Sequence, residues 1–187
     1  MAEDLHQFVT TTLYAALKHD VQDLRVFNRS DLVHAAYFHV RRLLLVQPGW
    51  TCRAQVAPGD THTELAPDLV IFRHGVFQVA LQLELHIAPD RPDSFPAEQM
   101  NERMSTLRQT VINLEATRPD GTSGSAGRGY LIGVFDTDDT WFYPDQAIWE
   151  KQSCFWLPVN CREFTPYDEW LGHWQKLARF PAAIRSS

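Results

Sequence analysis

The segment from Val76 to Ile87 is the feature that most constrains the fold of this chain. Every odd position from Phe77 to Ile87 is apolar, whereas the even positions carry mainly polar residues: Gln78, Ala80, Gln82, Glu84 and His86. Successive side chains of a β-strand point to opposite faces of the sheet, so this period of two predicts a strand with one apolar face. We therefore expect a long strand over residues 76–87.

The other elements follow from helical spacing and from turn residues. Apolar residues at helical spacing predict helices over residues 4–18, 30–47, 98–114 and 165–177. The second of these helices has Ser30 as its N-cap and Pro48-Gly49 at its end. Turn residues delimit further strands over residues 50–56, 68–72 and 130–135, with shorter ones over 141–143 and 155–159. The order α-α-β-β-β-α-β predicts an α/β fold: a single domain with a mixed sheet of four to six strands flanked by helices.

Composition is that of a globular protein. The 187 residues are 44% hydrophobic and 21% charged, ordinary values for one folded domain. We expect a single domain over 1–187, with its core at about 30–136 and a Trp-rich C-terminal extension at 137–187. The net charge of −6 argues against a protein that coats polyanions in general, although it leaves room for a local basic groove.

The cellular setting is predicted from segments and residues that the sequence lacks. No apolar run reaches the ~20 residues that span a bilayer, and the acidic N-terminus lacks the basic region of a secretory signal. Three cysteines, Cys52, Cys154 and Cys161, without CxxC spacing, indicate free thiols. We therefore expect a cytoplasmic protein.

Two carboxylates are placed together by the expected hairpin. A three-residue loop over 74–76 makes residues whose numbers sum to 150 face each other, so Asp68 lies opposite Gln82 and diagonal to Glu84, at about 7–8 Å. A loop one residue shorter would turn Glu84 to the other face. Paired carboxylates are ligands for a hard cation such as Mg²⁺ or Mn²⁺. Such an ion would polarise a phosphodiester and generate hydroxide.

The stretch PDLVIFRHGVFQVALQLELHI, Pro67 to Ile87, resembles the PD-(D/E)xK nuclease superfamily. The order helix, strand, PD strand, hairpin, E-x-K strand, helix and strand extends the resemblance over about Ser30 to Asp136. The resemblance implies a restriction-endonuclease-like fold and a Mg²⁺-dependent endonuclease that cuts DNA or RNA.

The family's Lys has no direct counterpart here, and two registers remain open. In one, Asp68 takes the Asp position, Glu84 the Glu position and His86 the Lys position, where a His with a pKa near neutrality can stabilise charge on the phosphate. In the other, Gln82 takes the Glu position and Glu84 the Lys position. Glu84 belongs to the site in both registers.

The flanking helices supply further candidates. His39 lies between Leu32, Ala35, Leu43 and Val46 on its helix, so we expect it to face the sheet, where many relatives carry a Glu. Asp31 is the alternative. Relatives also use a basic or amide residue on the next helix, which points to Arg103 and Gln99. These residues could also have purely structural roles. His39 could be a hydrogen-bonded core residue, Asp31 could simply lie at the start of its helix, and Arg103 could be solvated.

The leading hypothesis is a metal-dependent nuclease in which Asp68 and Glu84 hold Mg²⁺, water attacks in line, and the substrate is nucleic acid, DNA in the first place. The alternative is a non-catalytic subunit of the same fold that binds protein or nucleic acid. Exposed tryptophans in the C-terminal part would suit a protein partner, although they could equally be core: Trp149, Trp156, Trp170 and Trp174. A third hypothesis is an α/β domain with accidental similarity.

Overall fold

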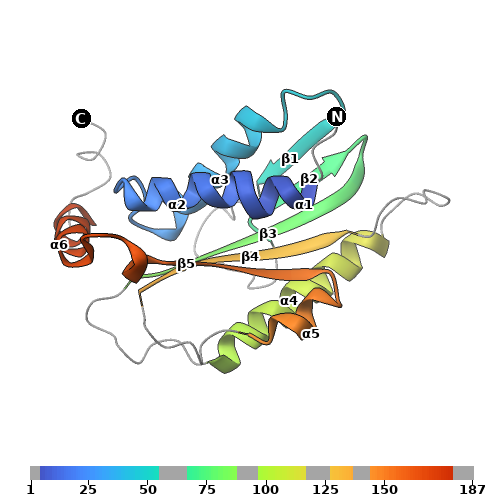
Figure 1. The fold of residues 1–187 in the computed structure, drawn as a ribbon. Coiled ribbons are helices and arrows are strands. Elements are labelled where there is room, and N and C mark those ends of the chain that lie inside the picture. The colour runs from blue at the N-terminus through green and yellow to red at the C-terminus, as the bar shows by residue number, and fades with distance from the viewer. Residues whose placement is uncertain (1–4, 55–66, 88–96, 117–126, 137–143, 179–187) are drawn as a thin grey trace.

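A mixed β-sheet forms the centre of the molecule (Figure 1). The computed structural model describes residues 5–54, 67–87, 97–116, 127–136 and 144–178. Within them the sheet has five strands in the order β1-β2-β3-β4-β5: β1 (Trp50–Ala54), β2 (Leu69–Arg73), β3 (Val76–His86), β4 (Arg128–Phe135) and β5 (Cys154–Asn160). Pairing is antiparallel from β1 to β3 and parallel from β3 to β5. The predicted α/β class with a mixed sheet is confirmed.

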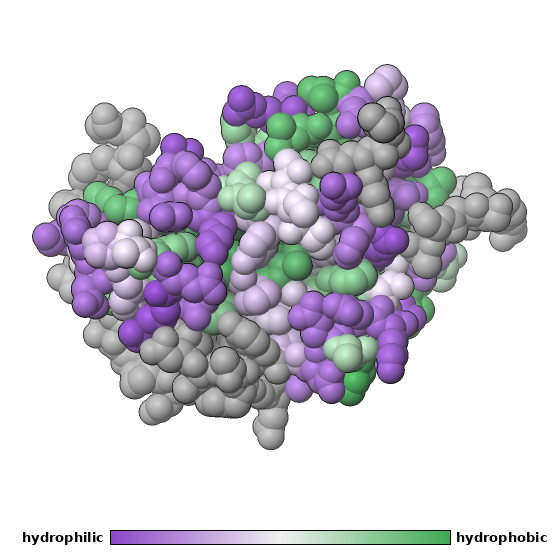
Figure 2. Space-filling model, viewed as in Figure 1, coloured by the Kyte–Doolittle hydropathy of each residue, from purple (hydrophilic) through white to green (hydrophobic). Residues whose placement is uncertain are grey.

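One face of the sheet is covered by the N-terminal helices (Figure 1). They are α1 (Leu5–Gln7), the π-helix η1 (Phe8–Leu13), α2 (Tyr14–Gln22) and α3 (Arg29–Leu43). Asn28 caps α3, because its side chain accepts a hydrogen bond from the Asp31 N–H at 2.9 Å. The predicted cap at Ser30 is therefore wrong by two residues. Figure 2 shows a mostly hydrophilic surface, with a hydrophobic patch over the end of α3, where Leu43 and Val46 are exposed.

The opposite face is covered by α4 (Ala97–Ala116) and the short α5 (Gln146–Glu150). The apolar stripe predicted for α4 is buried there: Met100, Met104, Leu107 and Val111. Apolar side chains from the even positions of β2 and β3, among them Val70 and Ala80, complete this second core. Two separate cores therefore lie on the two faces of one sheet.

The C-terminal part joins the first core. After β5 come a short 3₁₀ helix, η3 (Cys161–Glu163), and α6 (Tyr167–Ala178). Trp170 Nε1 donates to the carbonyl of Val21 at 3.3 Å, and Trp174 Nε1 donates to that of Val26 at 3.0 Å. Both indoles are buried, so they are core residues, and the first core reaches beyond residues 30–136. The strand predicted over 141–143 lies outside the described residues.

The β2–β3 hairpin differs from its prediction. Arg73 pairs with Val76, which leaves a two-residue loop, His74-Gly75, with φ of 50° and 78°. Both positive angles belong to the tight turn whose twist matches that of the strands. The predicted three-residue loop is wrong, and the shorter loop alone would shift the register by one residue.

A β-bulge restores the expected register. Phe72 pairs with Phe77, but Ile71 pairs with Val79 and Leu69 with Leu81. The extra residue is Gln78, and beyond it paired numbers sum to 150. The bulge also moves Phe77 into the core under α4, whereas Val79 lies in the core under α1–α3. The predicted placement of both residues on one face is wrong for this reason.

No helix in the described part of the chain is long and apolar enough to cross a membrane. Cys52, Cys154 and Cys161 are free thiols, as predicted.

Candidate functional site

Asp68, Gln82 and Glu84 lie where β2 begins and β3 continues past it. Asp68 directly precedes β2, whereas Gln82 and Glu84 lie on β3. Only 4% of Asp68, 5% of Gln82 and 4% of Glu84 is exposed. A buried carboxylate is costly unless its charge is compensated, so the partners of each one decide what the site can do.

The Asp68 carboxylate lies where the pairing of β2 with the central strand β3 ends. Extending the β2–β3 register by two residues places Pro67 opposite Leu83, and proline has no N–H to donate. Side chains supply the missing bonds: Asp68 Oδ2 accepts from the Leu83 N–H at 2.7 Å, and Arg29 Nε donates to the Leu83 carbonyl at 2.9 Å. Arg29 Nη2 closes the ring on Asp68 Oδ1 at 2.7 Å. Asp68 therefore has a structural role whatever its chemistry.

The Glu84 carboxylate has a different set of partners. Gln82 Nε2 donates to Glu84 Oε1 at 3.0 Å. Arg103 Nη1, from α4, lies 3.6 Å from Oε1, and His86 Nε2 lies 3.5 Å from Oε2. The structure thus brings Glu84 together with Gln82 and His86, the residues of both predicted registers. It also confirms that Arg103 reaches this site.

The two carboxyls differ in proton affinity. Burial raises the pKa of Asp68 to about 6, although Arg29 and the Leu83 N–H limit the rise; the charge of Glu84 adds to it. Burial also raises the pKa of Glu84. The contacts with His86, Arg103 and Gln82 outweigh burial and hold this pKa below its usual range. Glu84 is thus the more firmly ionised of the two.

His39 lies elsewhere. The buried face of α3 runs through Leu32, Ala36 and Val40, so His39 lies beside that face and its Nε2 contacts Asp20 Oδ2 of α2 at 2.6 Å. The prediction that it points toward the sheet is wrong, because Leu43 and Val46, which suggested a wider apolar face, are exposed.

Asp31 does not join the site either, because its Oδ2 accepts from the Phe27 N–H at 3.0 Å at the start of α3. The Gln99 side chain lies outside the described residues. The site residue that sequence reasoning missed is Arg29. It looked like part of a turn, and no local signal links it to Asp68, 39 positions along the chain.

Asp68 and Glu84 offer the hard oxygen ligands that Mg²⁺ prefers. Each of their four oxygens already faces a donor or a cation: Arg29 and Leu83 N–H on Asp68, and Gln82, Arg103 and His86 on Glu84. No group of three or more His, Cys, Asp or Glu among the described residues could hold a metal ion. As arranged, the pair does not fit a resident divalent cation, since an ion would have to displace Arg29 or Arg103.

Comparisons with protein-family models, with curated proteins and with solved structures find no significant match to this chain.

Proposed function

We propose that this chain is a restriction-endonuclease-like protein that binds nucleic-acid phosphates at the Asp68–Glu84 site without cutting them. The element order α3-β1-β2-β3-α4-β4 supports the fold, because it follows the order on which the superfamily resemblance rests. The pairing of β2 with β3 also supports this fold, because Asp68 directly precedes β2 and β3 carries Gln82 and Glu84. Function then depends on the charges in the site.

The observation that carries the proposal is the placement of cations around buried carboxylates. Exposed fractions of the side chains are 39% for Arg29, 34% for Arg103 and 24% for His86, whereas both carboxylates are buried. An anion approaching from solvent therefore meets the two guanidinium groups and the His86 imidazole first. A guanidinium has five N–H donors, and Arg29 directs its Nε and Nη2 inward. Both arginines therefore retain donors for a phosphate, which guanidinium groups bind in a forked geometry.

The absence of cleavage follows from the same charges. In this arrangement Arg29 and Arg103 provide the positive charge that a metal ion would provide in a nuclease. Neither register places a Lys beside Glu84, because one puts His86 at the Lys position and the other puts Glu84 there. The site is therefore suited to hold a phosphodiester rather than to activate water against it.

Metal-dependent hydrolysis is the second candidate, and the proton affinity of Asp68 favours it. A pKa of about 6 indicates that the ionised carboxylate is incompletely compensated, so an added cation would be favourable. Asp68 and Glu84 would hold that cation, which would supply Lewis-acid activation of the phosphodiester. This candidate requires Arg29 to release Asp68.

Fluorescence anisotropy with short labelled DNA and RNA, single-stranded and duplex, tests the proposal. Arg103→Ala should weaken binding roughly tenfold or more, because a charge-assisted hydrogen bond contributes about 1.5–3 kcal/mol. The matched control is Arg53→Ala, an exposed arginine on β1, which should bind as the wild type does. Melting curves of both variants confirm folding, and Arg103→Gln repeats the test with less loss of packing.

Incubation of the same substrates with Mg²⁺ or Mn²⁺ separates the two candidates. We expect intact substrate. Cleavage that Asp68→Asn abolishes would establish the second candidate instead. Binding that is equally strong in Arg103→Ala and Arg53→Ala, or absent for every substrate, would overturn the proposal.

A further inference from the structure

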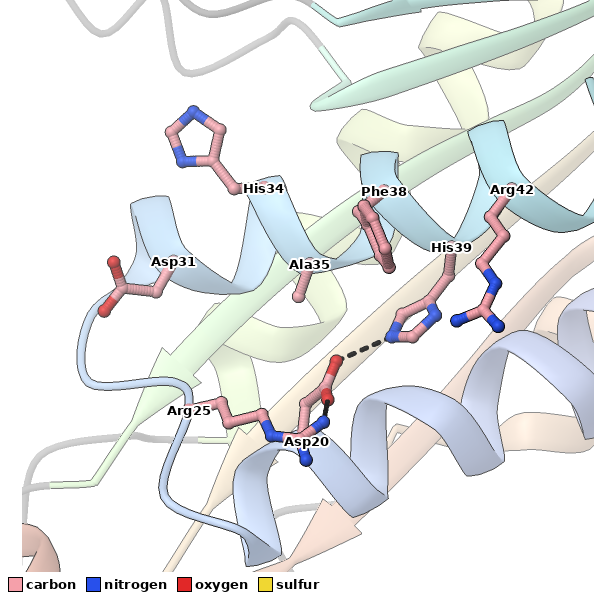
Figure 3. Close-up of a pocket in the computed structure, with 8 residues that line it drawn as sticks. All are labelled: Asp20, Arg25, Asp31, His34, Ala35, Phe38, His39 and Arg42. Carbon is pink, nitrogen blue, oxygen red and sulfur yellow. Dashed lines mark hydrogen bonds and ion pairs between the residues drawn. The ribbon is translucent and has the colours of Figure 1, made fainter. Parts of the chain in front are cut away.

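A pocket between α2 and α3 lies apart from the Asp68–Glu84 site, and Figure 3 shows its lining. Its volume is about 440 Å³, which is within the range of small-molecule sites. One continuous face of α3 forms most of the wall, including Phe38, His39 and Arg42, while Asp20 and Arg25 contribute from α2 and the segment after it. Charged, aromatic and imidazole groups therefore meet around one cavity.

The Asp20 carboxylate in the floor of this pocket has two partners. Asp20 is 7% exposed, and its two oxygens have separate partners: Arg25 Nη1 on Oδ1 at 3.0 Å and His39 Nε2 on Oδ2 at 2.6 Å. In Figure 3 the Asp20 side chain lies between these two groups. Its contacts fix the imidazole and place a guanidinium against the carboxylate; Arg25 also pairs with Asp23 at 3.0 Å, and Asp31 is a second carboxylate in the lining.

Phe38 gives the pocket an exposed aromatic wall. It is 56% exposed, and its ring lies edge-on to His39 with centroids 5.5 Å apart. The face of such a ring is available to stack on a planar ligand, an arrangement that is favourable beyond the apolar area it buries.

Arg42 places a cation beside that ring. It follows Phe38 by one helical turn, so the two side chains adjoin on the surface of α3. Arg42 forms no ion pair with another residue in the described ranges, and Figure 3 shows its guanidinium turned toward His39. An anionic group near Arg42 would therefore gain a charge-assisted hydrogen bond without breaking an existing ion pair.

From these contacts we propose that the α2–α3 pocket binds a small aromatic anion. The planar ring stacks on Phe38, and the anionic group, a carboxylate or a phosphate, accepts hydrogen bonds from Arg42. The Asp20–His39 pair forms the floor beneath the ligand. This site is independent of nucleic-acid binding at Asp68 and Glu84.

Calorimetric titration with two anionic probes, adenosine 5′-monophosphate and benzoate, tests this site. Adenosine and benzamide are the neutral counterparts and should bind at least tenfold more weakly. Arg42→Ala should weaken binding of the anions about tenfold, and Phe38→Ala should do so by a similar factor through lost stacking. The matched control is Arg41→Ala, the neighbouring exposed arginine, which should bind as the wild type does. All three side chains are on the surface, and melting curves verify that the variants fold.

The outcomes separate the ligand sources. Binding of the nucleotide alone would assign the pocket to phosphate-bearing ligands, and binding of both anions to aromatic anions in general. The proposal is overturned if neither anion binds at millimolar concentration, if the neutral probes bind equally well, or if Arg42→Ala and Arg41→Ala have equal affinities.

Discussion

Replacing Arg29 with methionine tests the ring of contacts at the edge of β3. Methionine keeps an apolar stem and removes the guanidinium, which donates to Asp68 Oδ1 at 2.7 Å and to the Leu83 carbonyl at 2.9 Å. The variant leaves a buried carboxylate with one remaining donor, the Leu83 N–H, and a strand-edge carbonyl without its side-chain partner.

The expected cost follows from the burial of the two groups. Removing one partner of a buried pair costs about 3–5 kcal/mol, but 39% of the Arg29 side chain is exposed, so solvent screens the pair. We therefore expect Arg29→Met to lower the free energy of unfolding by about 2–3 kcal/mol at pH 8. For a domain of this size that corresponds to a fall of roughly 4–12 °C in Tm.

The cost should depend on pH, because burial raises the pKa of Asp68 in the folded wild type to about 6 even with Arg29 beside it. Above pH 6 Asp68 is ionised and needs the guanidinium. At pH 5 the Asp68 carboxyl of the folded wild type already holds a proton. The variant should then be destabilised by only about 1 kcal/mol, through loss of the hydrogen bond from Arg29 to the Leu83 carbonyl.

Urea unfolding at pH 5 and pH 8 measures this difference. Asp68→Asn and the Asp68→Asn/Arg29→Met double variant complete a cycle that isolates the pairwise term. A cost that is the same at both pH values, or below about 0.5 kcal/mol at pH 8, would refute the reasoning.

Three further predictions concern the sheet and the carboxylates. Gly133→Ala should destabilise by about 1–3 kcal/mol in thermal melts, because its Cβ would overlap the Trp156 ring, whereas Gly172→Ala, with open space around it in α6, should stabilise slightly. Glu84→Gln should destabilise at neutral pH, because the pKa of Glu84 is lowered on folding; urea titrations should show the difference vanishing as pH falls through that folded pKa. Millimolar Mg²⁺ should leave Tm within about 1 °C, since the carboxylates that the structure describes at Asp68 and Glu84 are already occupied by Arg29 and Arg103; a rise abolished by Asp68→Asn would contradict this.

The alternation along β3 was sufficient to predict the strand, and the turn before it predicted the pairing with β2. The burial of Glu84 was not predicted, because the alternation indicated an apolar face only on the opposite side of the strand. The two-residue turn and the bulge at Gln78 could not be predicted together. Their effects on register cancel, so the pairs from Leu69–Leu81 to Ile71–Val79 have the predicted sum of 150 although the predicted loop is wrong. The spacing of residues along the chain indicates the overall register between two strands. It does not reveal a shorter turn and a bulge whose shifts in register cancel.

The partners in the site were harder to predict than its acids. Asp68 and Glu84 stand in a local motif, and Arg103 lies beside an apolar stripe, so each has a signal nearby in the sequence. Arg29 contacts Asp68 only because α3 begins beside the part of β3 that extends past its pairing with β2, which is a tertiary fact. For His39, two apolar residues that turned out to be exposed made the helix face look wider than it is.

The contacts between α2 and α6 have a consequence for synthesis of the protein. Val21 and Gln22 of α2 accept hydrogen bonds from Trp170, 149 and 148 positions later. At roughly 5–20 residues per second, a ribosome takes roughly 7–30 s to cover that distance. Until then no indole covers the C-terminal end of α2. Contacts between residues so far apart in the sequence also form slowly. We expect the nascent chain to expose this apolar face until α6 has emerged, and to complete its first core only then.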